Sequence, residues 1–212
     1  MKIRELIFAF IFCGLTSCNA IFTGLYGIKK LKTLDENTIV DYAKKYNIPL
    51  RDSYKMDTSY YSFLLSLDTA QYSEQIKNHY QPLQVLYYNK LGKLESFQLN
   101  CYTGGFPNLK WDRDEIMTIF PPKEQAPLDS ILPLSLHLNY LQQLPQTVKI
   151  ETNNYDYVVI VHWNRFMGRQ SKRLIRTVQE NTALAKHKTV KILYVNTDNL
   201  FAKQLRTVTT NK

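Results

Sequence analysis

Hydrophobic and polar residues follow one another in patterns that are typical of an α/β protein. Residues 157–163 are almost continuously apolar, as in a strand that is buried on both faces of a sheet. Apolar positions recur at helical spacing over residues 169–186, and residues 190–195 form another apolar strand. A strand, a helix and a strand in this order predict a βαβ unit with two parallel strands and a right-handed crossover.

An antiparallel hairpin is predicted before this unit. Residues 83–88 are an apolar and aromatic run, residues 89–93 make a turn that contains Gly92, and residues 94–99 alternate apolar with polar side chains. A helix is predicted to follow the hairpin, with Asp129 or Ser130 as its N-cap. The chain therefore has the order ββα then βαβ, and we expect one mixed sheet flanked by helices.

Other elements complete this prediction. The helix after the hairpin has Pro133 in its first turn and ends before Pro145. A helix is predicted after Asp35, its N-cap, as far as residue 46. Residues 60–67 are apolar and aromatic enough for an extra strand, and residues 69–80 suit a short helix.

The first seventeen residues have the features of a signal peptide. Lys2 and Arg4 make a short basic start, and residues 6–13 are an apolar run without a charge, a proline or a glycine. Eight residues span roughly 12 Å as a helix, whereas the core of a bilayer is about 30 Å thick. The run is therefore too short for a lasting transmembrane helix.

The residues Leu15, Thr16, Ser17 and Cys18 follow the apolar run. They resemble the lipobox of bacterial lipoproteins, which implies cleavage before Cys18 and acyl chains, palmitate among them, on this cysteine. Two or more acyl chains attach a protein stably to a membrane. Asn19 stands in place of the aspartate that retains some lipoproteins in the inner membrane, which favours the outer membrane. An ordinary signal peptide and an uncleaved anchor are the alternatives.

The length of the chain indicates its domain organisation, and its charge indicates the class of partner. A chain of 212 residues can bury one core, so we expect a signal peptide (1–17), a lipidated tether (18–34) and one domain (35–212). Lys and Arg outnumber Asp and Glu by 27 to 18, which gives a net charge of +9. This excess favours anionic lipid head groups or acidic glycans, or it is a solvated surface without a dedicated partner. The signal peptide argues against nucleic acid as a partner.

Residues 158–180 resemble the core of the thioredoxin family. In that family an apolar strand leads into a Trp-containing turn, a Cys-x-x-Cys motif at the start of a helix, and a basic amphipathic helix. Trp163 and Phe166 hold the aromatic positions of this pattern. The positions that correspond to the redox motif are Met167, Gly168, Arg169 and Gln170.

The predicted hairpin carries a second resemblance to the same family. Residues 81–93 are similar to the hairpin on the C-terminal side of thioredoxins, which implies that Pro82 is the family's cis-proline and faces the redox site. Here the hairpin precedes the βαβ unit. The resemblance therefore implies a circularly permuted or rearranged thioredoxin-like sheet.

Thiols are missing where this chemistry requires them. Disulfide exchange needs an attacking thiolate and a resolving thiol, and neither Met167 nor Gln170 supplies one. If Cys18 is acylated and Cys13 leaves with the signal peptide, Cys101 keeps the one free thiol and no intramolecular disulfide forms. Cys101 is then either a buried inert residue or the centre of a single-cysteine enzyme.

The remaining polar residues suggest no cofactor. The spacing of His79, His137, His162 and His187 is not typical of a metal site, and we expect no metal. A cluster of basic residues begins at the start of a predicted helix, where it suits an anionic ligand or forms an exposed basic helix face. This cluster comprises Arg165, Arg169, Lys172, Arg173 and Arg176.

These patterns together predict a lipid-anchored protein of the cell envelope. We expect its redox-inactive, thioredoxin-like domain to act as a binding or structural module and not as an enzyme. Its expected partners are the membrane, through the lipid on Cys18, and an envelope protein or a glycan. The alternatives are a thiol-dependent oxidoreductase that uses Cys101 and a glycan or polyanion binder.

Overall fold

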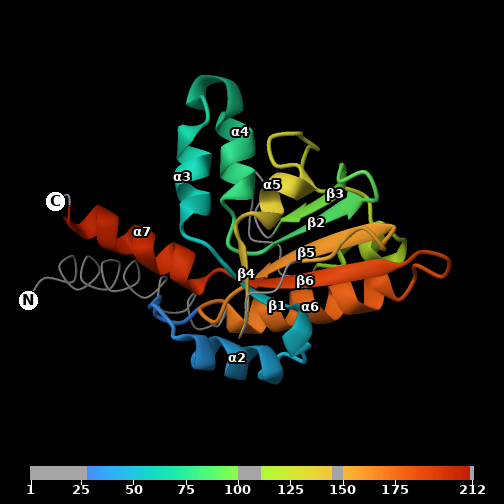
Figure 1. Ribbon diagram of the computed structural model, residues 1–212, viewed down its shortest axis with the longest axis horizontal. Helices are drawn as coiled ribbons and strands as arrows, with labels where there is room; N and C mark the ends of the chain where they lie inside the picture. The colour runs from blue at the N-terminus through green and yellow to red at the C-terminus, as the bar shows by residue number, and fades with distance from the viewer. Residues whose placement is uncertain (1–27, 100–110, 145–149, 211–212) are drawn as a thin grey trace, which may run out of the picture.

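A mixed β-sheet of six strands forms the centre of the protein (Figure 1). The structure is a computed structural model, and it describes residues 28–99, 111–144 and 150–210. The strands are β1 (Ser53–Met56), β2 (Gln84–Asn89), β3 (Leu94–Leu99), β4 (Leu141–Gln143), β5 (Tyr157–Trp163) and β6 (Val190–Asn196). They lie in the order β3-β2-β5-β6-β1-β4.

Parallel and antiparallel pairs both occur in this sheet. β5 is parallel to β6, which confirms the parallel pair predicted from the βαβ pattern, and β6 is parallel to β1. β2 is antiparallel to both β3 and β5, and β4 is antiparallel to β1. The predicted α/β class with a mixed sheet flanked by helices is therefore confirmed.

Helices cover both faces of the sheet (Figure 1). One face carries α2 (Glu36–Lys45) and α6 (Gly168–Thr182). The other carries α3 (Ser59–Ser66), α4 (Thr69–His79) and α5 (Leu134–Leu138). The chain continues after β6 as α7 (Asp198–Thr210), and two short 3-10 helices span Leu50–Asp52 and Arg113–Thr118.

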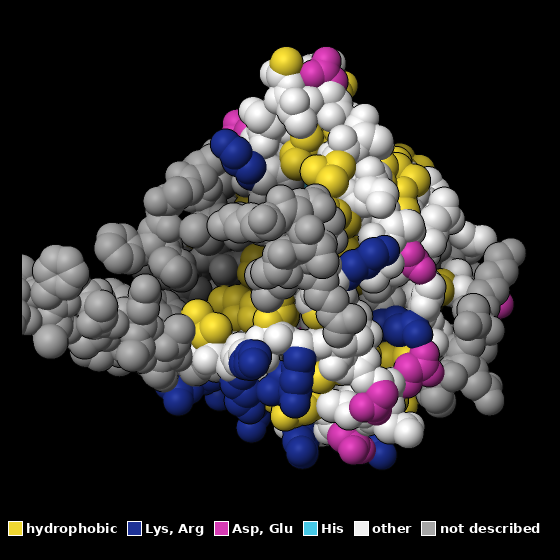
Figure 2. All heavy atoms as spheres, turned by 90° about the vertical axis from the view of Figure 1, so that its left-hand side faces the viewer, with side chains coloured by type: hydrophobic (Ala, Val, Ile, Leu, Met, Phe, Trp, Pro, Cys, Tyr) yellow, Lys and Arg dark blue, Asp and Glu magenta, His cyan; other side chains and the backbone are white. Residues whose placement is uncertain are grey.

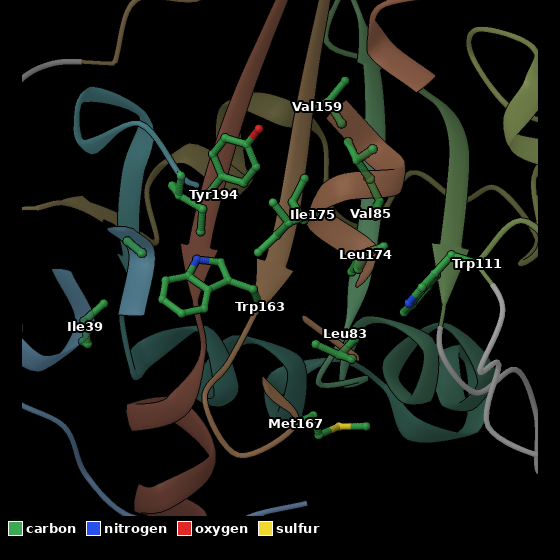
Figure 3. Packing of buried hydrophobic residues seen from close by; sticks show 14 of the residues in the cluster. Ile39, Leu83, Val85, Trp111, Val159, Trp163, Met167, Leu174, Ile175 and Tyr194 are labelled. Carbon is green, nitrogen blue, oxygen red and sulfur yellow. The ribbon is translucent and has the colours of Figure 1, made fainter. Parts of the chain in front are cut away.

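The central strand β5 contributes to a hydrophobic core on each side. Successive side chains of a strand point to opposite faces, so Val159 and Trp163 lie in the core under α2 and α6, whereas Ile160 lies in the core under α3, α4 and α5. Figure 3 shows Leu174 and Ile175 of α6 in the first core together with Trp163. Burial of one such side chain contributes about 1.5–3 kcal/mol, and burial on both faces explains the almost continuous apolar sequence of β5.

Local capping and turn signals match the structure in several places. The carboxylate of Asp35 accepts a hydrogen bond of 2.8 Å from the backbone N–H of Thr38, which confirms the predicted N-cap of α2. Gly92 has a positive φ of 74° in the turn between β2 and β3, as the predicted hairpin requires. The helix over residues 69–80 is also confirmed, as α4.

The predicted extra strand over residues 60–67 was wrong, because this segment is the helix α3. Tyr60 and Leu64, which are four residues apart, are buried, whereas Leu65 is 57% exposed. The apolar residues therefore follow a helical period that their aromatic character concealed. Asp57 starts the helix by accepting hydrogen bonds from the backbone N–H and the hydroxyl of Ser59. The strand added to the sheet is β1, which was not predicted.

The predicted helix between Asp129 and Pro145 was too long. Only the five residues of α5 are helical, and Pro133 is their N-cap. Residues 141–143 instead extend and pair with β1 as β4, with Leu141 opposite Met56. Pairing with a strand that is distant in the sequence overrides the local helical pattern here. The helix α6 ends at Thr182, four residues before its predicted end, and α7 was not predicted.

The first described residues lie against the domain. The backbone N–H of Lys29 donates a hydrogen bond of 2.7 Å to the carbonyl of Phe166. Leu34 is buried, and its backbone N–H and carbonyl both bond to the side-chain amide of Asn199. The last part of the predicted tether is thus attached at the end of β5 and the start of α7. Within the described ranges, no helix has the length and apolar character that crossing a bilayer requires.

Candidate functional site

Two kinds of predicted site residue lie outside the described residues. Cys18, the predicted site of acylation, and Cys101, the predicted free thiol, belong to the segments 1–27 and 100–110. The site described below is therefore built from the residues that correspond to the redox motif and from those that contact them.

The motif positions lie where β5 ends and α6 begins. Trp163 is the last residue of β5 and is fully buried, and Met167 is the N-cap residue of α6. Gly168 and Gln170 are buried in the first turn of α6, whereas Arg169 is exposed. Figure 3 shows Met167 at the same end of the core as Leu83, which precedes β2. The thioether of Met167 is thus a packing group.

Asn164 joins the turn after β5 to the loop before β2, and we refer to its surroundings as the Asn164 site. Its side-chain Nδ2 donates a hydrogen bond of 3.0 Å to the carbonyl of Pro82. Its Oδ1 accepts one of 2.8 Å from the backbone N–H of Met167. Its backbone N–H donates to the hydroxyl of Ser171, which in turn donates to the Asn164 carbonyl. The two loops that the family resemblance brings together therefore meet through Asn164.

Pro82 does not have the predicted cis peptide bond. Among the described residues, the cis bond lies between Phe120 and Pro121, and the bond between Gln81 and Pro82 is trans. The resemblance implied a cis-proline from the position of Pro82 before a hairpin, and that prediction was wrong. Here the Pro82 carbonyl faces the end of β5, where it accepts the Asn164 hydrogen bond.

Asp198 supplies a buried carboxylate at the edge of the Asn164 site. Its Oδ2 accepts hydrogen bonds from the backbone N–H of Arg165 and from the side chain of Asn196, at 2.6 and 2.9 Å. Burial raises the pKa of Asp198 above its usual range, although these hydrogen bonds oppose the shift. The carboxylate thus fixes the turn after β5 by hydrogen bonding. Together with Asn164 it forms a polar network that holds backbone in place.

A close contact at Gly168 predicts a rescue experiment. A Cβ at position 168 would collide with the hydroxyl of Tyr46, whereas the ring carbon that carries this hydroxyl would be 3.6 Å away. The Tyr46 ring packs edge-on against Trp163, so it cannot move freely. We therefore expect Gly168→Ala to destabilise the protein by about 1–3 kcal/mol through overpacking.

The same substitution in a Tyr46→Phe background is expected to cost nothing, or to stabilise by up to about 1 kcal/mol, because alanine restricts the unfolded chain. Urea unfolding of the parent, the two single variants and the double variant measures the cost of Gly168→Ala in each background. Equal costs of Gly168→Ala in both backgrounds would rule out the collision.

The basic residues of the predicted anion site lie close to this turn. Arg169 and Arg173 line a hollow of about 390 Å³ between α6 and the end of α2, beside Tyr46. The guanidinium of Arg165 lies 6.0 Å from the centre of the Tyr42 ring. The rings of Tyr42 and Tyr46 are themselves 6.0 Å apart, so the three arginines lie on one continuous part of the surface. The hollow suits an anionic group because its charged side chains are cationic.

Three histidines that are scattered in the sequence meet under α3, α4 and α5, and sequence reasoning missed them. Nε2 of His137 and Nε2 of His162 are 3.2 Å apart, and Nδ1 of His137 is 3.1 Å from the hydroxyl of Tyr88. Nε2 of His79 lies 3.0 Å from a carboxylate oxygen of Asp129. We refer to these five residues as the histidine cluster. No spacing rule could have found it, because the residues come from four separate segments of the chain.

The hydrogen bonds of the histidine cluster assign its protons. The Tyr88 hydroxyl donates to the carbonyl of Leu132, so it accepts from Nδ1–H of His137. Nε2 of His137 then accepts from Nε2–H of His162. Burial, together with the neighbouring His79, lowers the pKa of His162 to about 3, and burial also holds the pKa of His137 well below its usual value. The pair is therefore neutral near pH 7.

The histidine cluster has a packing role in the described structure. Its imidazoles are fully buried, and Tyr60 stacks on His137 with ring centres 5.9 Å apart. Within the described ranges, no three His, Cys, Asp or Glu side chains have a geometry that could hold a metal ion. A hollow of about 580 Å³ lies at the β2–β3 turn around Leu91 and Leu128; Asp129 of the histidine cluster lines it, whereas the histidines and Asn164 do not.

Comparisons with known proteins give no relative from which a role could be transferred. No protein-family model matches the chain, no curated protein matches it, and no solved structure matches the fold.

Proposed function

We propose that this protein is a lipid-anchored component of the bacterial cell envelope whose thioredoxin-like domain is redox-inactive and serves as a binding or structural module. One observation carries the proposal. At the end of β5, where the family resemblance implies a dithiol, Met167 is buried as a packing group and Asn164 bonds to the Pro82 carbonyl. This arrangement supports a redox framework that has lost its reactive sulfurs.

The sheet order supports the thioredoxin-like interpretation. The βαβ unit consists of β5, α6 and β6, and the hairpin of β2 and β3 lies beside it, with β2 antiparallel to β5. In the family, the hairpin follows the unit and its first proline faces the motif. Here the hairpin precedes the unit, yet Pro82 contacts the turn after Trp163 through Asn164. A circular permutation of the family's order accounts for both facts.

Chemistry excludes dithiol exchange at this position. The reaction needs a thiolate that attacks a disulfide and a second thiol that resolves the mixed disulfide. Met167 has a thioether, which does not ionise, and Gln170 has a neutral amide. The polar groups of Asn164 are bonded to backbone, and so they hold the turn in shape. This chemistry supports a module that presents a rigid surface over a dithiol enzyme.

Acylation of Cys18 is the first test of this proposal. We expect mass spectrometry of the full chain, expressed in a bacterium, to find a mature amino terminus at Cys18 with acyl chains attached. The Cys18→Ser variant should keep its signal peptide without acyl groups, and Cys101→Ser, as the matched control, should be processed like the parent. An intact, unacylated signal peptide on the parent chain would refute the lipid anchor.

The runner-up is a single-cysteine oxidoreductase, and one observation favours it. β3 ends at Leu99, which pairs with Gln84, so the last described residue before Cys101 lies at the same end of the strands as Pro82. A thiol assay distinguishes the two functions. Insulin or peroxide reduction by the full chain that disappears in Cys101→Ser would support the enzyme, whereas equal background rates in both proteins would support the module.

A further inference from the structure

A positively charged surface runs from the first described residues across α2 to the start of α6. Figure 2 shows dark blue side chains gathered along the lower part of one side of the molecule, the level at which α2 lies in Figure 1. Most of its members are exposed, and Arg165 is half-buried. We call this surface the basic face; it comprises Lys29, Lys30, Lys32, Lys45, Arg165, Arg169, Lys172 and Arg173.

Three cations of the basic face converge on one aromatic ring. Nζ of Lys45 lies 5.0 Å from the centre of the Tyr42 ring, Nζ of Lys29 lies 5.7 Å from it, and the guanidinium carbon of Arg165 lies 6.0 Å from it. The negative face of the ring offsets part of their mutual repulsion. A hydrogen bond with Arg165 and the charges of the two lysines lower the pKa of the Tyr42 hydroxyl. Positive charge is therefore concentrated at this point.

Carboxylates near the basic face are engaged elsewhere. Asp35 caps α2, Glu36 pairs with Lys55, and Asp198 is buried in the Asn164 site. Asp41 of α2 pairs with Lys44 at 3.9 Å, and neither residue belongs to the basic face. Lys29, Lys45 and Lys172 form no ion pair among the residues that the structure describes. The field of the basic face is thus left for a partner with the opposite charge.

The second half of the basic face provides a recess for that partner. Arg169, Lys172 and Arg173 line the hollow of about 390 Å³ beside Tyr46, together with the amides of Asn47 and Gln179. Cationic and amide donors around an open recess suit a phosphate group. The recess and the cations around Tyr42 lie on the same surface, so a partner that presents many phosphates could occupy both at once.

The place where the described chain begins indicates which partner the basic face contacts. Lys29, a member of the basic face, bonds to the carbonyl of Phe166, so the described chain begins on this surface, close in sequence to Cys18. The ten intervening residues span at most roughly 35 Å when fully extended. An acylated Cys18 would therefore keep the basic face close to the bilayer, whose anionic head groups carry phosphates at high surface density.

We propose that the basic face docks on anionic phospholipid head groups, which fixes the orientation of the domain on the membrane. This inference rests on the proposed lipid anchor, and it adds a second contact that depends on charge. In this orientation α2 and the start of α6 face the bilayer. α3, α4 and α5, on the opposite face of the sheet, point away from it and stay accessible to envelope partners.

Lysine footprinting on vesicles tests this orientation. The full chain is reconstituted on vesicles of phosphatidylcholine alone or mixed with phosphatidylglycerol, and exposed amines are acetylated with a membrane-impermeant reagent. We expect Lys29, Lys45 and Lys172 to react at least threefold more slowly on the anionic vesicles. Lys90 and Lys186, which are exposed outside the basic face, should react equally on both. Equal rates at all five lysines would overturn the proposal.

Charge-reversal variants give an independent measurement. Lys29→Glu, Lys45→Glu and Lys172→Glu, combined in one chain, should abolish the difference in protection, whereas Lys90→Glu, Lys123→Glu and Lys186→Glu, combined as the matched control, should keep it. All six side chains are exposed, so neither set removes a buried contact. A protein that binds soluble heparin through these residues but shows no protection on anionic vesicles would overturn the proposal in favour of a glycan ligand.

Failure of the anchor and failure of the docking are distinguishable. Flotation with pure phosphatidylcholine vesicles at about 1 M salt reports the anchor alone, because the Debye length falls to about 3 Å. Loss of flotation there contradicts the lipid anchor. Flotation there without footprint protection on anionic vesicles contradicts the docking alone.

Discussion

Lowering the pH from about 7 to about 4 is expected to reduce the free energy of unfolding by on the order of 3 kcal/mol through His162 alone. His162 is 1% exposed, and its Nε2–H donates to His137 within the histidine cluster. A second proton on either imidazole would place a buried positive charge there. On His137 this proton would go to Nε2 and would also leave two N–H groups facing each other across 3.2 Å.

The direction of this effect follows from the pKa of His162 in the two states. In the folded protein the pKa is lowered to about 3, whereas the unfolded chain titrates near 6.5. Between these values the unfolded state binds the extra proton, so stability falls steadily as the pH drops below about 6.5. Above that value both states are neutral at this residue, and His162 contributes no pH dependence.

Urea unfolding as a function of pH measures the loss. His162→Gln removes one of two titrating imidazoles and should reduce the slope of the stability profile between about pH 6.5 and 4, whereas His137, whose pKa is also lowered by burial, keeps a remaining slope. His187→Gln, which changes an exposed histidine, should leave the slope of the parent unchanged. A slope in His162→Gln as steep as that of the parent would show that acid does not act through His162.

Asn164→Ala is expected to lower the free energy of unfolding by about 2–4 kcal/mol. The substitution removes the hydrogen bonds from Nδ2 to the Pro82 carbonyl and from the Met167 N–H to Oδ1. Asn164 is fully buried, so these backbone groups would lose their partners in a place that water does not readily reach. The connection between the β2 and β5 loops would also be lost.

Denaturant unfolding again provides the measurement, with amide hydrogen exchange as the local readout. Exchange should speed up in the turn that contains Met167 before it changes in the centre of β5. Asn153→Ala is the matched control, because Asn153 is an exposed loop residue and its loss should change stability by less than about 0.5 kcal/mol. Equal effects at the two positions would contradict the bridging role of Asn164.

Much of the sheet could be predicted because its strongest elements are encoded locally. β5 is buried on both faces, which requires an unbroken apolar run, and Gly92 marks the turn of the hairpin. Asp35, the N-cap residue, likewise marks the start of α2 in the sequence. These signals involve residues that are close together in the sequence. They can therefore be recognised in the sequence without knowledge of the remainder of the fold.

Elements that depend on distant partners were predicted wrongly or missed. β4 is a strand because Leu141 pairs with Met56, although Leu141 continues the helical pattern of the preceding leucines. The histidine cluster forms because α4, α5 and β5 converge, and none of these histidines has a neighbour in sequence that reveals its role. Local patterns carry no information about such contacts.

In the candidate site, too, some features could be predicted from local sequence and others depend on distant contacts. The position of the motif at the end of β5 followed from the apolar strand, the Trp and the basic helix. The part played by Asn164 did not, because its partner Pro82 lies eighty-two residues earlier in the chain. The basic cluster on α6 was visible in the sequence, whereas its union with Lys29 and Lys45 around Tyr42 depends on how α2 packs beside α6.

The attachment of the first described residues has a mechanical consequence. Any tension along the amino-terminal segment reaches the Lys29 to Phe166 hydrogen bond first, then the one from Arg165 to the Lys30 carbonyl, and then the pair that links Leu34 to Asn199. These few bonds lie outside the β-sheet, so they would detach one after another under load while the strands stay joined. The segment would thereby lengthen and let the folded body swivel as its surroundings move.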